Sequence, residues 1–264
     1  MKALALDFDG VLSDSAREAF AVALRTFAAL RPGSRLAGAA EAPEAEAQRA
    51  LYGAFVGLMP LGNRGDDYAV ALAALEAGVA IKDQADYGAW YASQEVPFLR
   101  AFHARFYEVR SEWARRDPEG WLRLLPPFAP LLEVLRRRAG EARYAIATAK
   151  DRASVESLLA AYGAADLFDP GLILDKDTGV SKRAHLGHLA RGLGLPFEEI
   201  TFVDDKVNHL MEAAPLGVRC ALAGWGYNGL REEQAAREAG FLVCTLEDAE
   251  ARLFGPPPPA GNVR

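Results

Sequence analysis

Two aspartates one residue apart, Asp7 and Asp9, are the residues whose types and spacing most directly indicate chemistry in this sequence. They follow the short apolar run 3–6 and precede Gly10. Two carboxylates this close repel each other unless a cation or a shared proton lies between them. The pair therefore indicates a metal site, an acid/base pair, or both. The alternative is that two solvated side chains cap a turn.

The element that must position these aspartates is the run 3–6, which has no polar residue and predicts a fully buried strand. Side chains alternate along a strand, so Asp7 and Asp9 would point to the same side, and a bend at Gly10 lets both reach over its end. In an open α/β sheet, ligands bind beyond the carboxyl ends of the strands. Both carboxylates are therefore expected at the ligand-binding edge of a sheet.

A hydroxyl follows the next predicted strand, 144–147, where Thr148 precedes a helix start at Asp151. Such a hydroxyl, helped by backbone N–H groups, can hold a phosphate oxygen. A threonine in this place can also simply cap the helix. Thr148 is thus a candidate for phosphate binding beside the two aspartates.

Two further acids, Asp204 and Asp205, follow the predicted strand 200–203 and make a second metal-site candidate, because oxygen ligands suit Mg²⁺. Lys182 begins the helix before that strand, and Lys176 lies earlier in the same loop. A lysine here would balance the carboxylates as a point charge. Solvated side chains are the alternative for both lysines.

Short apolar strands alternate with helices over the second half of the chain, which predicts a parallel sheet covered on both faces. The expected fold class is α/β, with a doubly wound, Rossmann-like core. The predicted strands are 3–6, 144–147, 171–174, 200–203, 218–223 and 241–244. The helices predicted between them are 128–138, 154–162, 182–193, 206–214 and 232–239.

The segment between the first two strands reads as helical throughout, with helices expected at 14–30, 44–58, 66–77 and 94–116. We expect a core made of residues 1–14 and 123–254 and an all-helical insertion at 15–122. An insertion that leaves the core beside the candidate site can act as a lid. Residues 255–264 are rich in Pro and Gly and are expected to be disordered.

The four polar pieces, taken in order at the strand ends, resemble the haloacid dehalogenase-like hydrolase superfamily. The stretch from Ala3 to Leu12, with its Asp-x-Asp-Gly-Val pattern, resembles the first signature. The segment 145–150 is similar to the second, in the Thr-x-Lys form of phosphoglycolate phosphatase relatives, a branch with a helical cap. Lys182 fits the spacing of the third signature. The Asp204-Asp205 pair resembles the fourth, with Asp205 at the metal-binding position and Asp204 at that of the common glycine.

The resemblance implies a role for each residue. Asp7 would attack phosphorus and form an aspartyl-phosphate, and Asp9 would act as acid and then as base. Mg²⁺ would be held by Asp7, Asp205 and the backbone carbonyl of Asp9. Thr148 and Lys182 would hold the other phosphate oxygens.

One position departs from the family pattern. Where many relatives carry a further acid, this chain has His209, with Asn208 beside it. Either side chain could reach a water on the metal or orient Asp205. Both could equally be ordinary helix-surface residues.

The function implied by the resemblance is Mg²⁺-dependent hydrolysis of a small phosphomonoester. An Asp at position 9 speaks against dehalogenases, phosphonate hydrolases and ion-pumping ATPases, which as families lack it. A sugar phosphomutase and a non-catalytic ligand-binding or regulatory protein remain alternatives, and a 2-haloacid dehalogenase is a minor one. For a small phosphorylated metabolite, Arg64, in a glycine-flanked loop of the insertion, is the candidate substrate contact.

The bulk composition is that of an ordinary globular protein of 264 residues, with 51% hydrophobic and 25% charged residues. A net charge of −6 argues against a nucleic-acid partner. Two cysteines, Cys220 and Cys244, suggest neither zinc nor a disulfide framework. No signal peptide is recognised, and no apolar run reaches the roughly 18 residues of a membrane helix, so a cytoplasmic location is expected.

Overall fold

A computed structural model describes residues 1–40, 46–62, 64–179 and 181–255, and it divides into two compact units. The core unit consists of Met1–Asp14 and Pro126–Arg264, and the helical unit is Ser15–Leu125. The sequence analysis put these bounds after residues 14 and 122. Apart from Gly255, the tail expected to be disordered lies outside the described residues.

The core unit is built on one parallel sheet of six strands, which confirms the predicted fold class. The strand order is β3-β2-β1-β4-β5-β6. The chain builds outward from β1 on one side and then crosses to β4 on the other, so the topological switch point lies between β1 and β4. The strands are β1 (Ala3–Leu6), β2 (Arg143–Ala147), β3 (Ile173–Leu174), β4 (Ile200–Asp204), β5 (Arg219–Ala223) and β6 (Leu242–Cys244).

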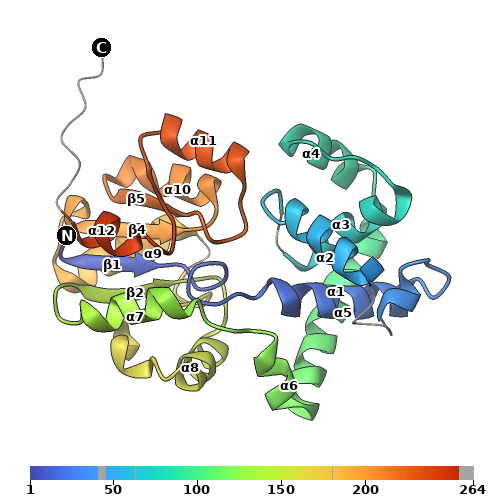
Figure 1. Ribbon diagram of the computed structural model, residues 1–264, viewed down its shortest axis with the longest axis horizontal. Coiled ribbons are helices and arrows are strands. Elements are labelled where there is room, and N and C mark those ends of the chain that lie inside the picture. Colours follow the sequence, from blue (N-terminus) through green and yellow to red (C-terminus); the bar gives the residue numbers. More distant parts are fainter. Residues whose placement is uncertain (41–45, 63, 180, 256–264) are drawn as a thin grey trace. The chain divides into compact units, whose positions relative to one another are not determined.

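Helices cover both faces of this sheet (Figure 1). On one face, small side chains such as Ala3 and Ala5 form a core with apolar residues of α9, α10 and α11. On the other face, the Tyr144 hydroxyl donates to Leu135 O of α7, and its ring packs against Phe254 of α12. The helices of the core unit are α7 (Ala129–Arg137), α8 (Arg152–Ala161), α9 (Lys182–Leu193), α10 (Val207–Ala213), α11 (Leu230–Glu238) and α12 (Ala249–Phe254).

The register of the central strands aligns their carboxyl ends. Leu6 of β1 pairs with Ile146 of β2 on one side and with Val203 of β4 on the other. The next residue, Asp7, continues this pattern, because its N–H donates to Val203 O at 2.9 Å. The polar residues that follow β1, β2 and β4 therefore begin at one level of the sheet.

The helical unit contains no strand among its described residues, in line with the sequence analysis. Its core is a chain of aromatic contacts that runs from Phe20 through Phe55, Tyr68 and Phe106 to Phe102. The helices are α1 (Ala16–Leu30), α2 (Glu46–Leu58), α3 (Gly65–Ala77), α4 (Gln84–Ala92), α5 (Val96–Arg116) and α6 (Pro118–Arg123).

Helix α4 has no counterpart in the sequence analysis. Tyr87 is its only buried residue, so the apolar periodicity that reveals a helix is missing. The helix is instead marked by its cap, since the Asp83 carboxylate accepts from the N–H groups of Ala85 and Asp86.

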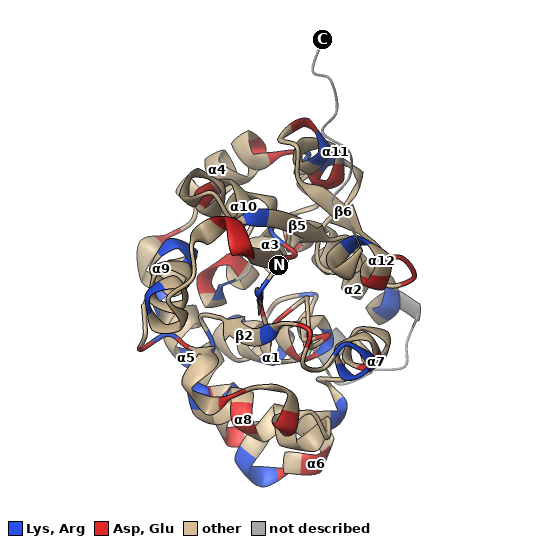
Figure 2. Ribbon diagram, turned by 90° about the vertical axis from the view of Figure 1, so that its left-hand side faces the viewer, with Lys and Arg blue, Asp and Glu red and all other residues tan. Residues whose placement is uncertain are grey.

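Acidic and basic residues share the same helices, as in α7, α11 and α12 (Figure 2). Within the described part of the chain, no helix is both long and apolar enough to cross a membrane.

Candidate active site

Lys182 joins two carboxylates at the carboxyl edge of the sheet. Its Nζ lies 2.8 Å from Asp7 Oδ1 and 3.1 Å from Asp204 Oδ2, and it donates to Ala147 O at 2.7 Å. The position of Lys182 follows from the local sequence, because Ser181 caps α9 by accepting from the Ala184 N–H. All three charged side chains are buried, so their charges interact through a poorly screened environment.

Burial and charge set the ionisation of this triplet. Burial raises the pKa of Asp7 above its ordinary value, and Lys182 opposes this only in part. Burial acts the same way on Asp204, but Lys182 and His209 outweigh it and hold the Asp204 pKa low. Burial also acts to lower the pKa of Lys182, and the two carboxylates outweigh it and raise that pKa. The ammonium therefore stays charged, and Asp7 is the less stabilised of the two anions.

His209 contacts Asp204. Its Nδ1 lies 3.1 Å from both carboxylate oxygens of Asp204. Burial acts to lower the pKa of His209, but the Asp204 charge outweighs it and raises the pKa. Asp7, Asp204 and His209 offer ligand atoms that all lie within 4.8 Å of one another, the one such group of His, Cys, Asp or Glu among the described residues. The sequence analysis had considered His209 as a partner of Asp205 or of a metal-bound water.

Asp205 lies beneath the turn that follows β1. Its Oδ2 accepts from the Tyr227 N–H at 2.9 Å, and Lys206 Nζ lies 3.8 Å away. A side chain at Gly10 would meet Asp205 Oδ2 at 2.5 Å, and Gly10 has a φ of +80°, so only glycine fits there. The turn therefore passes directly over the Asp205 carboxylate.

The other carboxylate oxygen of Asp205, Oδ1, is buried and has no hydrogen-bond partner among the described residues. Burial raises the pKa of Asp205 to about 7, against the opposing charge of Lys206. A buried carboxylate oxygen without a partner is costly unless a cation compensates it. A carboxylate oxygen is a ligand that Mg²⁺ prefers, so this unpartnered atom fits a divalent cation.

Asp9 pairs with a lysine that the sequence analysis did not single out. Lys150 Nζ lies 3.2 Å from Asp9 Oδ1, and the Lys150 side chain is 3% exposed. Its backbone N–H donates to Thr148 Oγ1 at 3.2 Å, so one turn after β2 carries both residues. The Thr-x-Lys pattern contained the signal, since an alternating polar pair at a strand end places both side chains near one edge.

The loop after β5, residues 224–228, contacts the turn after β1 and Asp205. The Tyr227 hydroxyl donates to Asp14 Oδ1 at 3.1 Å, and Trp225 Nε1 donates to Val11 O at 3.2 Å. A side chain at Gly226 would lie 2.3 Å from Asp205 Cβ and 2.5 Å from Gly10 O. The segment 224–228 therefore packs tightly against the Asp205 carboxylate and the turn after β1.

The remaining candidates lie outside this cluster. Lys176 and Asn208 are exposed; the Lys176 N–H donates to Lys150 O, and Asn208 Oδ1 accepts from the His209 N–H. Arg64 belongs to the helical unit, where it is exposed at the start of α3 and its N–H donates to Asp67 Oδ2 at 3.0 Å. Of the two lysines before β4, Lys182 is the one that contacts the carboxylates.

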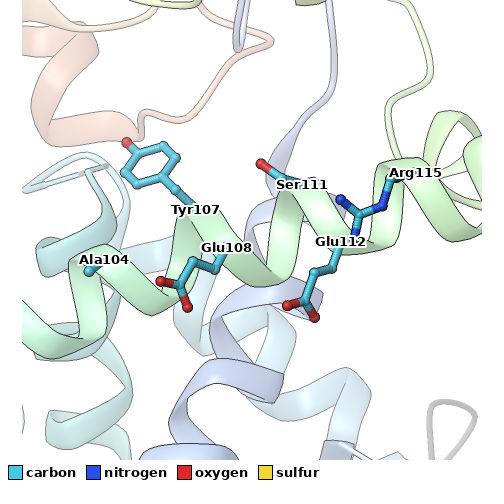
Figure 3. A pocket seen from close by; sticks show the side chains of 6 residues that line it. All are labelled: Ala104, Tyr107, Glu108, Ser111, Glu112 and Arg115. Carbon is cyan, nitrogen blue, oxygen red and sulfur yellow. The ribbon is translucent and has the colours of Figure 1, made fainter.

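The helical unit has an open hollow of about 440 Å³ along α5 (Figure 3). One helix supplies the whole lining, which mixes two acids and one base with small and aromatic groups. This surface carries none of the groups that the sequence analysis singled out. Its residues are Ala104, Tyr107, Glu108, Ser111, Glu112 and Arg115.

Comparison with known proteins adds a family and a set of similar folds. The family model of haloacid dehalogenase-like hydrolases matches residues 1–217. A search of curated proteins finds no match.

Among solved structures, a predicted phosphoglycolate phosphatase from Haemophilus somnus 129PT is 18% identical, with a TM-score of 0.61 and coverage of 94% of this chain and 96% of that one. A protein from Lactobacillus delbrueckii subsp. bulgaricus, described in equivalent terms, is 15% identical, with a TM-score of 0.64 and coverage of 97% and 99%. A haloacid dehalogenase-like family protein from Streptococcus pneumoniae is 12% identical, with a TM-score of 0.62 and coverage of 96% and 98%. At these identities the likeness concerns the fold.

Proposed function

Because the chain belongs to the haloacid dehalogenase-like hydrolase family, we propose that it is a Mg²⁺-dependent phosphatase acting on a small phosphomonoester. The observation that carries the proposal is the contact of Lys182 Nζ with both Asp204 and Asp7, the latter two residues along the chain from the half-buried Asp9. A buried cation next to a carboxylate that can attack, with a second carboxylate close by, suits phosphoryl transfer through a covalent intermediate.

In the first half of the reaction, an Asp7 oxygen attacks phosphorus and forms an aspartyl-phosphate. The bond from phosphorus to the ester oxygen breaks, and its electron pair goes to that oxygen. Asp9, in its acid form, gives the leaving oxygen a proton. Lys182 and Thr148 stabilise the phosphate oxygens as charge builds on them.

In the second half, a water oxygen attacks phosphorus and gives a proton to the Asp9 carboxylate. The bond between Asp7 and phosphorus breaks, which restores the Asp7 carboxylate and releases inorganic phosphate. The turn at Gly10 and the loop 224–228 keep the carboxylates of the site in place through both halves.

The residues that would hold Mg²⁺ are Asp7, Asp205 and the backbone carbonyl of Asp9. The buried, unpartnered Asp205 Oδ1 supports a cation at this place. Asp204 and His209 are alternative ligands, because with Asp7 they form a compact donor group. When bound, the ion would offset the negative charge that carboxylate and phosphate bring together.

For the substrate, we propose a small phosphorylated metabolite, with Arg64 binding its non-reacting part. Arg64 is exposed at the start of a helix whose first turn carries Asp66 and Asp67. A guanidinium suits bidentate recognition of a carboxylate or a second phosphate. One structure with a similar fold is described as a predicted phosphoglycolate phosphatase, so phosphoglycolate belongs in the first substrate panel.

The experiment is phosphate release by the purified protein, with and without Mg²⁺. The panel contains phosphoglycolate, sugar phosphates, nucleotides and an aryl phosphate. We expect Mg²⁺-dependent turnover that Asp7→Asn abolishes. Asp166→Asn, which removes the charge of an exposed aspartate in the core unit, is the matched control and should retain turnover.

Three results would contradict the proposal. Halide release from 2-haloacids without phosphate release would make the protein a dehalogenase. Transfer of phosphate between positions of a sugar phosphate would make it a mutase. Absence of all turnover, with ligand binding that survives Asp7→Asn, would make it a binding protein.

A further inference from the structure

We infer that Lys150 is a positioning residue for Asp9: it holds Asp9 Oδ1 so that Oδ2 exchanges protons with the leaving group and the attacking water. The inference rests on the proposed function, in which Asp9 is the acid and base. The roles that the family resemblance implies do not include one for Lys150, the lysine of the Thr-x-Lys pattern.

The geometry separates the two oxygens of Asp9. Oδ1 is buried and receives no hydrogen bond from the described residues, while Lys150 Nζ lies 3.2 Å from it. The Asp9 side chain as a whole is nevertheless 32% exposed. Since Oδ1 contributes nothing to that exposure, Oδ2 is the carboxylate oxygen that can be accessible. The carboxylate is thus held at one oxygen, and only the other can meet a substrate or a water.

The backbone of Lys150 is held in turn at the end of β2. Its backbone N–H donates to Thr148 Oγ1, and its backbone O accepts from the Lys176 N–H at 3.4 Å. Its Nζ also lies 6.0 Å from the centroid of the Phe8 ring, in the turn that carries Asp9. A small change at this strand end therefore moves both Thr148 and the ammonium that holds Asp9.

Stability alone gives a poor reason for a buried lysine here. Lys150 precedes Asp151, the cap of α8, and a positive charge near a helix N-terminus is unfavourable. Buried ion pairs often stabilise no better than apolar residues of similar size. An ammonium with 3% exposure at this place therefore argues for a task at the site.

If Lys150 positions Asp9, the effect of losing Lys150 should depend on the leaving group of the substrate. A poor leaving group, such as the alkoxide of an alkyl phosphate, needs a proton from Asp9 as its bond to phosphorus breaks. A 4-nitrophenolate leaves without one. If Lys150 acts by aiming Asp9 Oδ2, its loss must slow the alkyl ester far more than the aryl ester.

The experiment compares wild type, Lys150→Met, Lys150→Arg and Asp9→Asn on an alkyl phosphate and on 4-nitrophenyl phosphate. For Lys150→Met we expect kcat/KM on the alkyl ester to fall roughly 10- to 100-fold and kcat/KM on the aryl ester to stay within about threefold, because kcat/KM reports on departure of the leaving group and not on the hydrolysis of the aspartyl-phosphate that both esters share. Lys150→Arg keeps the charge and should recover part of the loss. Asp9→Asn should show the same preference for the aryl ester.

Two further variants complete the design. In the double variant Asp9→Asn with Lys150→Met, the second change should add less than about twofold, because residues that act through one group are not additive. Lys2→Met removes a surface lysine paired with Glu199 at the opposite end of β1 and should leave both esters unchanged. Circular dichroism and the unfolding temperature of each variant report on folding.

The possible results distinguish a failure of the inference about Lys150 from a failure of the proposed phosphatase function. Equal losses of kcat/KM on both esters would overturn the inference, since Lys150 would then act on the phosphate or on the fold. No loss on either ester would also overturn it. If Lys150→Met does not fold, the contrast between the two esters in Lys150→Arg decides. A wild-type protein that hydrolyses neither ester would overturn the proposed function and the inference with it.

Discussion

Lys182 Nζ lies 2.8 Å from Asp7 Oδ1, which joins the first residue of α9 to the first residue after β1. The same ammonium lies 3.1 Å from Asp204 Oδ2, and all three side chains are buried. One cation is therefore shared by two carboxylates that would otherwise repel each other in a poorly screened place. Reactivity and stability are coupled at this contact.

Lys182→Met should lower both the rate of phosphate release and the stability of the fold. Two buried carboxylates then face each other without their cation, so we expect kcat/KM for phosphate release to fall at least about 100-fold. The free energy of unfolding should fall by about 3 kcal/mol, the usual cost of breaking a buried pair. Steady-state kinetics and urea denaturation measure the two effects. Lys176→Met changes an exposed lysine of the preceding loop, and a comparable loss there would contradict the assignment to Lys182.

Gly226→Ala should weaken binding of a divalent cation without changing any ligand. The added Cβ would lie 2.3 Å from Asp205 Cβ and 2.5 Å from Gly10 O, so the Asp205 carboxylate must shift. We expect the dissociation constant for Mn²⁺, measured by titration calorimetry, to rise roughly 10-fold or more. In Gly229→Ala the nearest contact is an ordinary 3.6 Å, so this variant is the control. Equal affinity in both variants would show that Asp205 does not hold the cation.

Glu18→Ala should destabilise the helical unit. The Glu18 side chain is 3% exposed, and its Oε1 lies 2.7 Å from Arg110 Nε and accepts from Trp121 Nε1 at 3.1 Å. The loss leaves the half-buried Arg110 guanidinium and the buried Trp121 N–H without this acceptor, so we expect urea denaturation to show a loss of about 3 kcal/mol.

The exposed pair of Glu108 and Arg105 provides the matched control for Glu18. Its atoms lie 3.0 Å apart, but the side chains are 62% and 37% exposed. Glu108→Ala should cost less than about 1 kcal/mol. A similar cost for the two variants would mean that burial does not decide the strength of these pairs.

His185 should make folding sensitive to acid. Burial lowers its pKa below 6.5. Its Nε2 lies 3.0 Å from Asp175 O and 2.9 Å from Gly179 O, whereas Nδ1 is buried without a partner in the described structure. A second proton must go to Nδ1, where nothing accepts it. Between the lowered pKa and 6.5 the unfolded chain binds more protons than the folded one, so stability rises with pH through this window.

Urea denaturation at several pH values between 5 and 8 measures this effect, since the midpoint should be highest above the unfolded pKa of about 6.5 and fall as the pH drops below it. In His185→Gln the midpoint should fall less steeply below pH 6.5. Histidine resonances followed by NMR give the pKa of His185 in the folded protein. A value at or above 6.5 would contradict the prediction.

Strand positions could be predicted from the sequence because a doubly covered parallel sheet needs uninterrupted apolar strands. The run 3–6 became β1, and 200–203 became the greater part of β4. The equal level of the strand ends followed from the fold class, and this allowed Asp7 and the acids at the end of β4 to be proposed as one cluster, which Lys182 joined through the family resemblance. The pattern of apolar residues predicts these strands because both faces of the sheet are buried.

Side-chain partners could not be predicted in the same way. Asp204 and Asp205 are adjacent and identical in type, so only the backbone at the end of β4 decides that Asp204 contacts Lys182 and His209. The partner of Asp9 depended on the turn after β2, which brings Lys150 back toward the first strand. Contacts of this kind depend on backbone geometry that a pattern of residue types does not encode.

The helical unit enters and leaves the core unit at one hydrogen-bonded spot. Asp14 N–H donates to Pro126 O at 2.8 Å, and Phe128 N–H donates to Leu12 O at 3.0 Å, so the two crossings of the chain run side by side. The ends of the insertion are therefore as close together as the ends of a short loop would be. Such an arrangement makes the insertion exchangeable: mutation or recombination can replace the 15–125 segment while the strand order and the carboxylates of the core stay as they are. New substrate preferences can then arise without rebuilding the chemistry.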